Sequence, residues 1–250
     1  MLWQAFGRWG GLNGSSEGGG GISGDPNFSS VVLLLGYNGA DASTVITDES
    51  PAARGNASIV DGAELDTAVK KFGTASLYCP GTTDAITYPD HADFTFGSGD
   101  FTVETWFYHQ EAGANDALIT KYNGASDHEW ALFVDPDGAI AFFWSTNGSA
   151  DSSITASPGY STGTWYHVAF SRVGNTGYLC FNGTIIASGS MSGVTIFNSA
   201  ALLCIGANNN GTTADFLGHI DETRITKGVG RYSGAVSSSY TVPTAAFPRA

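Results

Sequence analysis

The 250-residue sequence predicts an all-β chain that folds as a two-sheet antiparallel sandwich. Short segments rich in β-branched and aromatic residues recur along it, beginning with 31–37, 75–79, 84–88 and 100–109. Turn sequences such as "DPDG", "GNTG" and "NG" separate the later segments. No stretch keeps a helical period beyond a turn or two, and residues 61–73 are the best helix candidate. Many short strands joined by tight turns are typical of a sandwich.

Alternation within the segments indicates which faces are buried. In "FTVETWFY", Phe101, Val103 and Phe107 share one face, whereas Glu104 and Trp106 share the other. "TWYHVAFSR" alternates in the same way. Two inner faces of this kind predict an apolar core between two sheets.

Composition excludes several classes of function. The formal net charge is -13, which disfavours nucleic acid and anionic lipid as partners. No apolar run is long enough to insert into a membrane, and the start of the chain does not read as a secretory signal. Cys79, Cys180 and Cys204 lie in apolar segments without metal-type spacing, so we expect free core cysteines.

Residues 1–30 read as an aromatic head followed by a glycine- and serine-rich, extended arm. Ordering such a segment costs about 1–2 kcal/mol per residue, so it needs a surface to pack against. Trp3, Phe6 and Trp9 are side chains of the kind that anchor interfaces. We therefore expect them to form an assembly contact, with the chain acting as a homo-oligomer or as part of a larger particle.

Four linked motifs carry a family resemblance: "DFTVETWFY", "GTWYHVAFSRVGNTGYLCFNG", "LLCIG" and "FLGHIDETRITKGVGRY". Across residues 31–232 the chain resembles the laminin-G-like, concanavalin-A-like jelly-roll family. The resemblance implies two curved sheets, glycan or protein binding at loop ends, and calcium at a sheet edge in some members. "TKGVGRY" and the extended tail 233–250 resemble modules of phage and marine bacterial surface proteins.

The same resemblance argues against catalysis. Glycosidases on this fold carry a Glu-x-Asp-x-Glu strand, and the matching positions here are His219, Asp221 and Thr223, so both glutamates are missing. In an ideal strand Glu222 lies beside Arg224, which predicts a structural ion pair rather than a general acid. No nucleophile or phosphate-binding motif is present. We therefore expect no enzyme activity.

Calcium is the one cofactor that the sequence suggests. Asp41 and Asp48 follow the first predicted strand, and pairing of the first and last strands brings Asp221 towards them. Carboxylates and carbonyls are the ligands that calcium prefers. The alternative is that Asp41 and Asp48 cap turns.

Candidates for glycan contact are Trp130, Trp144, Asn208, Asn209 and Asn210, because sugar sites combine aromatic rings with amides. The alternative for the tryptophans is strand core, and "NNNG" also suits a turn.

The favoured function is a virion structural protein: a capsid decoration, tail fibre or adhesin subunit that carries a lectin-like module. Such a protein is made in the host cytoplasm and lies on the virion surface. Its partners are copies of itself, other virion proteins and host glycans. A free-standing lectin is the alternative, and a glycoside hydrolase is least favoured.

Overall fold

The predicted all-β sandwich is confirmed by a computed structural model. It describes residues 24–81, 83–111, 116–124, 126–135, 138–208, 210–211, 213 and 216–250. The helices in this part of the chain are two 3-10 turns, η1 (Phe28–Ser30) and η2 (Ala92–Phe94). Neither of them is long and apolar enough to cross a membrane.

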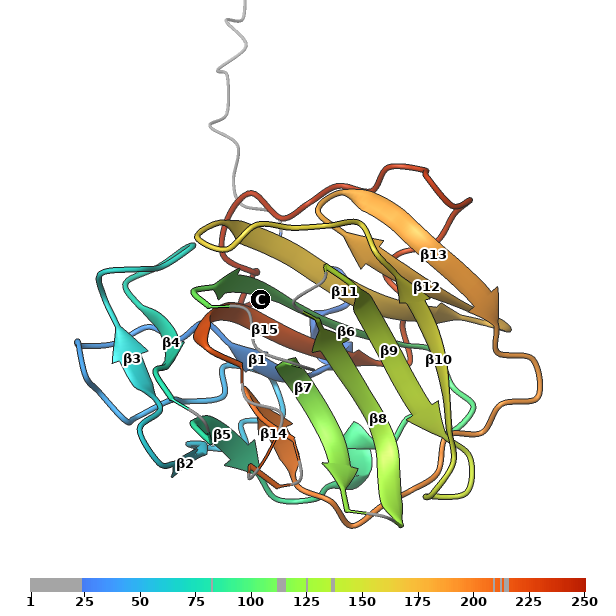
Figure 1. The fold of residues 1–250 in the computed structure, drawn as a ribbon, viewed down its shortest axis with the longest axis horizontal. Coiled ribbons are helices and arrows are strands. Elements are labelled where there is room, and N and C mark those ends of the chain that lie inside the picture. Colours follow the sequence, from blue (N-terminus) through green and yellow to red (C-terminus); the bar gives the residue numbers. More distant parts are fainter. Residues whose placement is uncertain are drawn as a thin grey trace, which may run out of the picture.

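Two antiparallel sheets face each other (Figure 1). In order across the sheet, the larger one contains β13 (Thr184–Ser190), β12 (Thr176–Phe181), β11 (Trp165–Val173), β6 (Phe101–His109), β15 (Gly218–Lys227), β4 (Ser76–Cys79) and β3 (Glu64–Asp66), with β1 (Val31–Leu35) also paired to β15. The other contains β10 (Asp151–Ala156), β9 (Ile140–Ser145), β8 (Asp127–Val134), β7 (Asp116–Asn123), β14 (Leu203–Ile205), β5 (Ala85–Tyr88) and β2 (Ser58–Val60).

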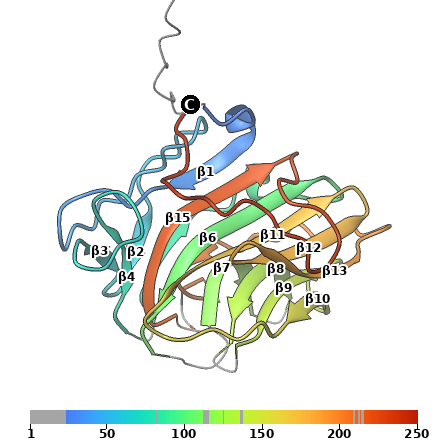
Figure 2. The ribbon, with the colours of Figure 1, turned by 90° about the horizontal axis from the view of Figure 1, so that it is seen from above.

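The first and last strands pair, as expected, with Leu34 opposite Arg224. Figure 2 shows β1, β15, β6 and β11 side by side. The helix candidate at 61–73 instead contains β3, because Leu65 pairs with Leu77 and both side chains enter the core.

The core lies between the sheets, where the predicted inner residues Phe101, Val103 and Phe107 are fully buried. Phe142 and Phe170, from opposite sheets, stack with ring centroids 3.8 Å apart. Burying each such side chain contributes about 1.5–3 kcal/mol. The three cysteines are buried and free, as predicted.

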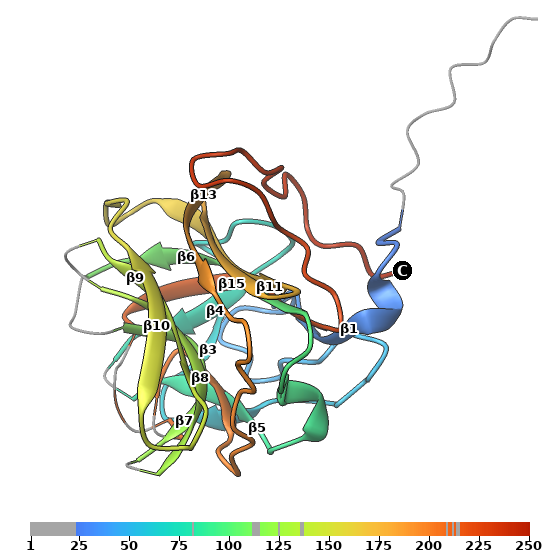
Figure 3. The same cartoon turned by 90° about the vertical axis from the view of Figure 1, so that its right-hand side faces the viewer.

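Both ends of the described chain pack on the outside of the sandwich. The amide of Asp25 donates a hydrogen bond of 2.7 Å to the carbonyl of Ala250, so the C-terminus lies beside η1 (Figure 3). Phe247 is 3% exposed and packs against Val31 and Leu34. The predicted arm is therefore joined to the domain from Asp25 onward. Its head, with Trp3, lies outside the described residues, as do Phe6 and Trp9.

Candidate functional site

The outer face of the larger sheet carries a row of four aromatic rings. Tyr78 on β4, His219 on β15, Tyr108 on β6 and Trp165 on β11 stand opposite one another in register. Directly opposed residues share a face. Because neighbouring positions on these strands enter the core, all four rings point outward. We call this set the aromatic row. Its successive ring centroids are 4.5, 5.8 and 5.6 Å apart.

The row combines exposed rings with unused polar groups. Tyr78, Tyr108 and Trp165 are partly exposed, and His219 lies between them with 1% of its surface exposed. Within the described part of the chain, neither tyrosine hydroxyl makes a hydrogen bond. Nε2 of His219 lies 2.9 Å from Oδ2 of Asp66, whereas its Nδ1 is buried and has no partner there. Because an ionised carboxylate only accepts, Nε2 carries the hydrogen, and Nδ1 is a free acceptor.

Burial keeps this imidazole neutral. It lowers the pKa of His219 from 6.5 to about 4, against the opposing effect of the Asp66 carboxylate. The unfolded chain therefore binds a proton below about pH 6.5 that the folded chain takes up only near pH 4.

We expect acidification through this window to lower the free energy of unfolding by about 3 kcal/mol through His219 alone. The variant His219→Gln keeps a donor for Asp66 but does not titrate. Urea unfolding of both proteins between about pH 6.5 and about pH 4 isolates the effect as the difference between them. If the free energy of unfolding has the same pH dependence in the two proteins, His219 is not the source of the loss of stability.

The next position along the same face is covered by a loop. Trp106 lies beneath Lys71, whose Nζ is 4.1 Å from the ring centroid, and beneath Phe72, which contacts it edge-on at 5.7 Å. Asp221 anchors this loop: its Oδ2 accepts the amides of Lys71 and Phe72 at 2.8 and 2.9 Å. Its Oδ1 accepts the amide of Glu222 at 2.8 Å.

Three positions on β15 match those that carry acids in glycosidases, and here they hold His219, Asp221 and Thr223. None of the three presents an accessible carboxyl group. Burial raises the pKa of Asp221 to about 7, although its three amide donors favour the ionised form. The carboxyl is nonetheless fully enclosed and cannot reach a bound sugar. Thr223 turns inward, where its hydroxyl meets those of Tyr37 and Thr105 at 2.8 and 2.9 Å. His219, the third position, is the centre of the aromatic row.

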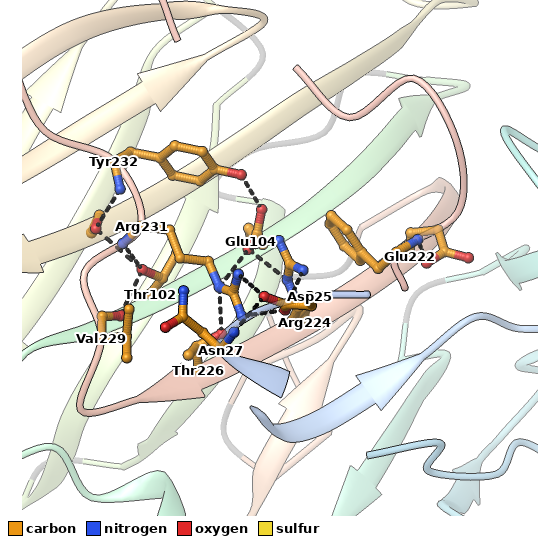
Figure 4. A network of polar contacts seen from close by, with 12 residues as sticks. Asp25, Asn27, Thr102, Glu104, Glu222, Arg224, Thr226, Val229, Arg231 and Tyr232 are labelled. Atoms are coloured by element: carbon orange, nitrogen blue, oxygen red, sulfur yellow. Dashed lines mark hydrogen bonds and ion pairs between the residues drawn. The ribbon is translucent and has the colours of Figure 1, made fainter. Parts of the chain in front are cut away.

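Further along this face lies a buried polar network (Figure 4). Glu104 on β6 is fully buried, and its Oε1 accepts from Arg224 Nε at 2.9 Å. Its Oε2 accepts the hydroxyl of Tyr232 at 2.6 Å and lies 3.2 Å from Nε2 of His167. Burial acts to raise the pKa of Glu104, but Arg224 and His167 outweigh it and hold this pKa well below its usual range.

The network fastens the ends of the described chain to the sheet. Asp25 accepts from Arg224 Nη1 at 3.1 Å and from Arg231 Nη2 at 2.6 Å. Arg231 and Tyr232 follow β15, so they hold the chain where it leaves the last strand. This part of the outer face is a structural lock.

The predicted pair between Glu222 and Arg224 is wrong. Glu222 adopts a positive φ of 49°, and the register with β6 shifts between Asp221 and Arg224. This β-bulge turns Arg224 to the outer face that Asp221 also occupies. Glu222 instead binds Arg249, with Oε1 2.9 Å from Nη2, and accepts the amide of Phe247 at 2.8 Å.

The tryptophans predicted to contact glycans also lie elsewhere. Trp130 and Trp144 are 0% and 5% exposed within the core, so neither ring can stack on a sugar. Phe133 and Phe143, on the same two strands as these tryptophans, point outward from the smaller sheet and are partly exposed. Their rings meet edge-to-face at 5.6 Å, which makes a second, smaller aromatic surface.

The asparagine candidates form a turn. Asn208 is buried, and its backbone amide donates to the carbonyl of Thr213 at 2.6 Å. Oδ1 of Asn210 accepts the amide of Leu202 at 3.0 Å. Asn209 lies outside the described residues. The turn interpretation therefore accounts for Asn208 and Asn210.

The proposed calcium ligands each have other contacts. Asp41 is exposed and accepts the amide and hydroxyl of Thr67, both at 3.0 Å. Asp48 is buried and accepts the amide and hydroxyl of Ser50 at 2.9 and 2.8 Å. In the described part of the chain, no three His, Cys, Asp or Glu residues are grouped to hold a metal ion, so these two and Asp221 form no common site. Calcium binding stays a prediction.

Comparison with protein families matches residues 80–229 to the concanavalin A-like lectin/glucanases superfamily. No curated protein matches the sequence. Among solved structures, the binding domain of Paraclostridial mosquitocidal protein 1 is 16% identical, with a TM-score of 0.62 over 81% of this chain and 50% of that one. The binding domain of botulinum neurotoxin serotype D is 15% identical, with a TM-score of 0.60 over 82% and 50%. The chain thus spans about half the length of these two domains.

Domain 4 of an extracellular arabinanase from Geobacillus stearothermophilus, solved with arabinotriose, is 21% identical. Its TM-score is 0.61 over 80% of this chain and 93% of that one. At such identities the likeness shows a shared fold.

Proposed function

The chain belongs to the concanavalin A-like lectin/glucanase superfamily, and from this premise we propose that it is a non-catalytic glycan-binding module. The aromatic row is its binding surface. The observation that carries this proposal is the alignment of Tyr78, His219, Tyr108 and Trp165 across four adjacent strands, with three of the rings partly exposed.

The chemistry of the row suits a sugar. The C–H face of a pyranose or furanose ring is apolar and packs on an aromatic face, while its hydroxyls need donors and acceptors. Tyr78 and Tyr108 are partly exposed and offer hydroxyls that make no hydrogen bond within the described part of the chain. A mainly aromatic surface with a few polar groups is the usual composition of a small-molecule site.

Two further observations support the proposal. The arabinanase domain, which this chain covers almost end to end, was solved with a short sugar chain bound. The strand that carries acids in glycosidases presents no open carboxyl here, because Asp221 is enclosed and Thr223 faces inward. Binding without hydrolysis is the activity that fits both.

Trp165→Ala is expected to weaken glycan binding by about 2 kcal/mol, or roughly thirtyfold in Kd, because it removes the exposed ring at one end of the row. Phe143→Ala, on the smaller sheet, is the matched control and should leave binding unchanged. A glycan array on the wild-type protein identifies a ligand, and calorimetry then compares the variants. Loss of binding in Phe143→Ala with retention in Trp165→Ala would move the site to the other sheet.

The wider proposal is that this module is part of a virion structural protein that presents it to host glycans. Support comes from the sequence: the aromatic head, the glycine-rich arm, and the resemblance of residues 226–250 to phage surface modules. In this account the arm docks on another copy of the chain or on another virion protein.

Deleting residues 1–24 is expected to leave a folded monomer, since Asp25 and its contacts with Arg224 and Arg231 are retained. Light scattering of the full and shortened chains compares their masses. An oligomer that becomes a monomer on deletion supports the arm as the assembly contact. Oligomers of equal order in both proteins would place that contact in the domain instead.

A further inference from the structure

We propose that the aromatic row selects uncharged glycan chains and discriminates against acidic ones, with Glu64 and Asp66 as the residues that determine this specificity. The inference rests on the proposed function and names the class of ligand that the same site takes.

The two carboxylates stand at one end of the row. Glu64 on β3 lies directly opposite Tyr78 on β4, so it extends the row by one strand. Leu65 enters the core, which turns Glu64 and Asp66 to the outer face together. Both are partly exposed, and Asp66 reaches His219 across β4. A ligand that stacks on Tyr78 therefore meets two negative charges.

Two cations lie near this end of the row, and among the described residues neither forms an ion pair with Glu64 or Asp66. Nζ of Lys70 donates to the carbonyl of Thr67 at 2.7 Å, whereas Nζ of Lys71 packs over the rings of Trp106 and Phe72 at 4.1 and 5.6 Å. The whole chain adds a formal net charge of -13, so the long-range field has the same sign as the local one.

The spacing of the row indicates a chain rather than a single sugar. Neighbouring strands lie about 4.8 Å apart, so each strand crossed adds one ring to the surface. A glycan that runs across β4, β15, β6 and β11 contacts several rings in succession, whereas a monosaccharide contacts one or two of them. The terminal sugar of such a glycan, on the side of β3, then lies beside Glu64 and Asp66.

The size of the effect follows from Coulomb's law with the dielectric constant of bulk water. A carboxylate on the ligand at about 6 Å from two protein carboxylates is disfavoured about tenfold in Kd at low salt. Screening shortens the range of this repulsion to about 8 Å at physiological ionic strength. Added salt therefore reduces the difference in Kd between acidic and neutral glycans.

The test is an array of paired glycans, each printed as a neutral chain and as the same chain carrying one carboxylated sugar. We expect the full-length protein to bind the neutral member about tenfold more tightly, with a smaller ratio in high salt. Glu64→Gln should reduce the ratio severalfold, because it removes one of the two carboxylates at this end of the row. Asp151→Asn removes one charge from the edge strand of the other sheet and is the matched control.

Each outcome distinguishes the claims. Equal binding of neutral and acidic members overturns this inference and leaves the glycan-binding function standing. Equal effects of Glu64→Gln and Asp151→Asn on the ratio overturn the assignment to Glu64, since net charge then suffices. Binding of neither member, in a protein that is folded by circular dichroism, overturns the proposed function and this inference with it.

Discussion

Replacing Glu104 with alanine is expected to lower the free energy of unfolding by about 3–5 kcal/mol, the largest effect of any single substitution considered. Glu104 is fully buried and holds Arg224, Tyr232 and His167 through its two oxygens. Without it the guanidinium of Arg224 keeps, among the described residues, Asp25 as its carboxylate partner. A buried charge that loses its main partner is costly because it has also lost its hydration. Urea unfolding at neutral pH measures the loss.

The double variant Glu104→Leu with Arg224→Met is the control for this prediction. Replacing both members of a buried ion pair by apolar residues of similar size is often close to neutral, so the double variant should be more stable than Glu104→Ala. If Glu104→Ala has the same midpoint of urea unfolding as the wild-type protein, the network does not stabilise the fold as described here.

Replacing Arg249 with methionine is expected to cost about 2–3 kcal/mol at neutral pH. Arg249 lies at the end of the chain and binds Glu222, which is 1% exposed, as well as Glu49. Burial already raises the pKa of Glu222, and Arg249 opposes this rise together with the backbone amide of Phe247. Its removal raises that pKa further, so the folded variant favours a protonated Glu222.

The sign of the pH dependence follows. A carboxyl whose pKa is raised in the folded state destabilises the protein increasingly as the pH rises above its unfolded pKa. Arg249→Met should therefore lose most stability at mildly alkaline pH and least near pH 4.5, the ordinary pKa of glutamate. Glu222→Gln in the same background removes the titrating group and should flatten this dependence. A loss that is independent of pH contradicts the account of Glu222.

The sequence was sufficient to predict the architecture because short-range patterns determine it. Alternation in "FTVETWFY" identifies the buried face of β6 without knowledge of its neighbours. The family motifs likewise indicated that β1 and β15 pair, which the structure confirms. Apolar surroundings predicted that the three cysteines are buried and free.

The site required information that the sequence does not display. The bulge at Glu222 shifts alternation by one position, so Arg224 lies on the face opposite to the one that an ideal strand predicts. In "EWALFV" alternation alone leaves open which set faces inward, and Trp130 proved to be core while Phe133 faces out. The aromatic row comes from four strands that are far apart in sequence. Only their register reveals it, although Tyr78, Tyr108 and Trp165 each stood in a recognised strand.

The central claim is that glycans bind along the aromatic row, and titration of the labelled protein with an array-selected neutral oligosaccharide, followed by NMR, tests it most directly. The indole N–H signal of Trp165 is expected to shift as the ligand is added, together with amides of β4, β6 and β15 around the row. The buried indoles of Trp130 and Trp144 serve as internal references and should not move. Shifts confined to β8 and β9, around the rings of Phe133 and Phe143, with the Trp165 signal unchanged, would contradict the claim.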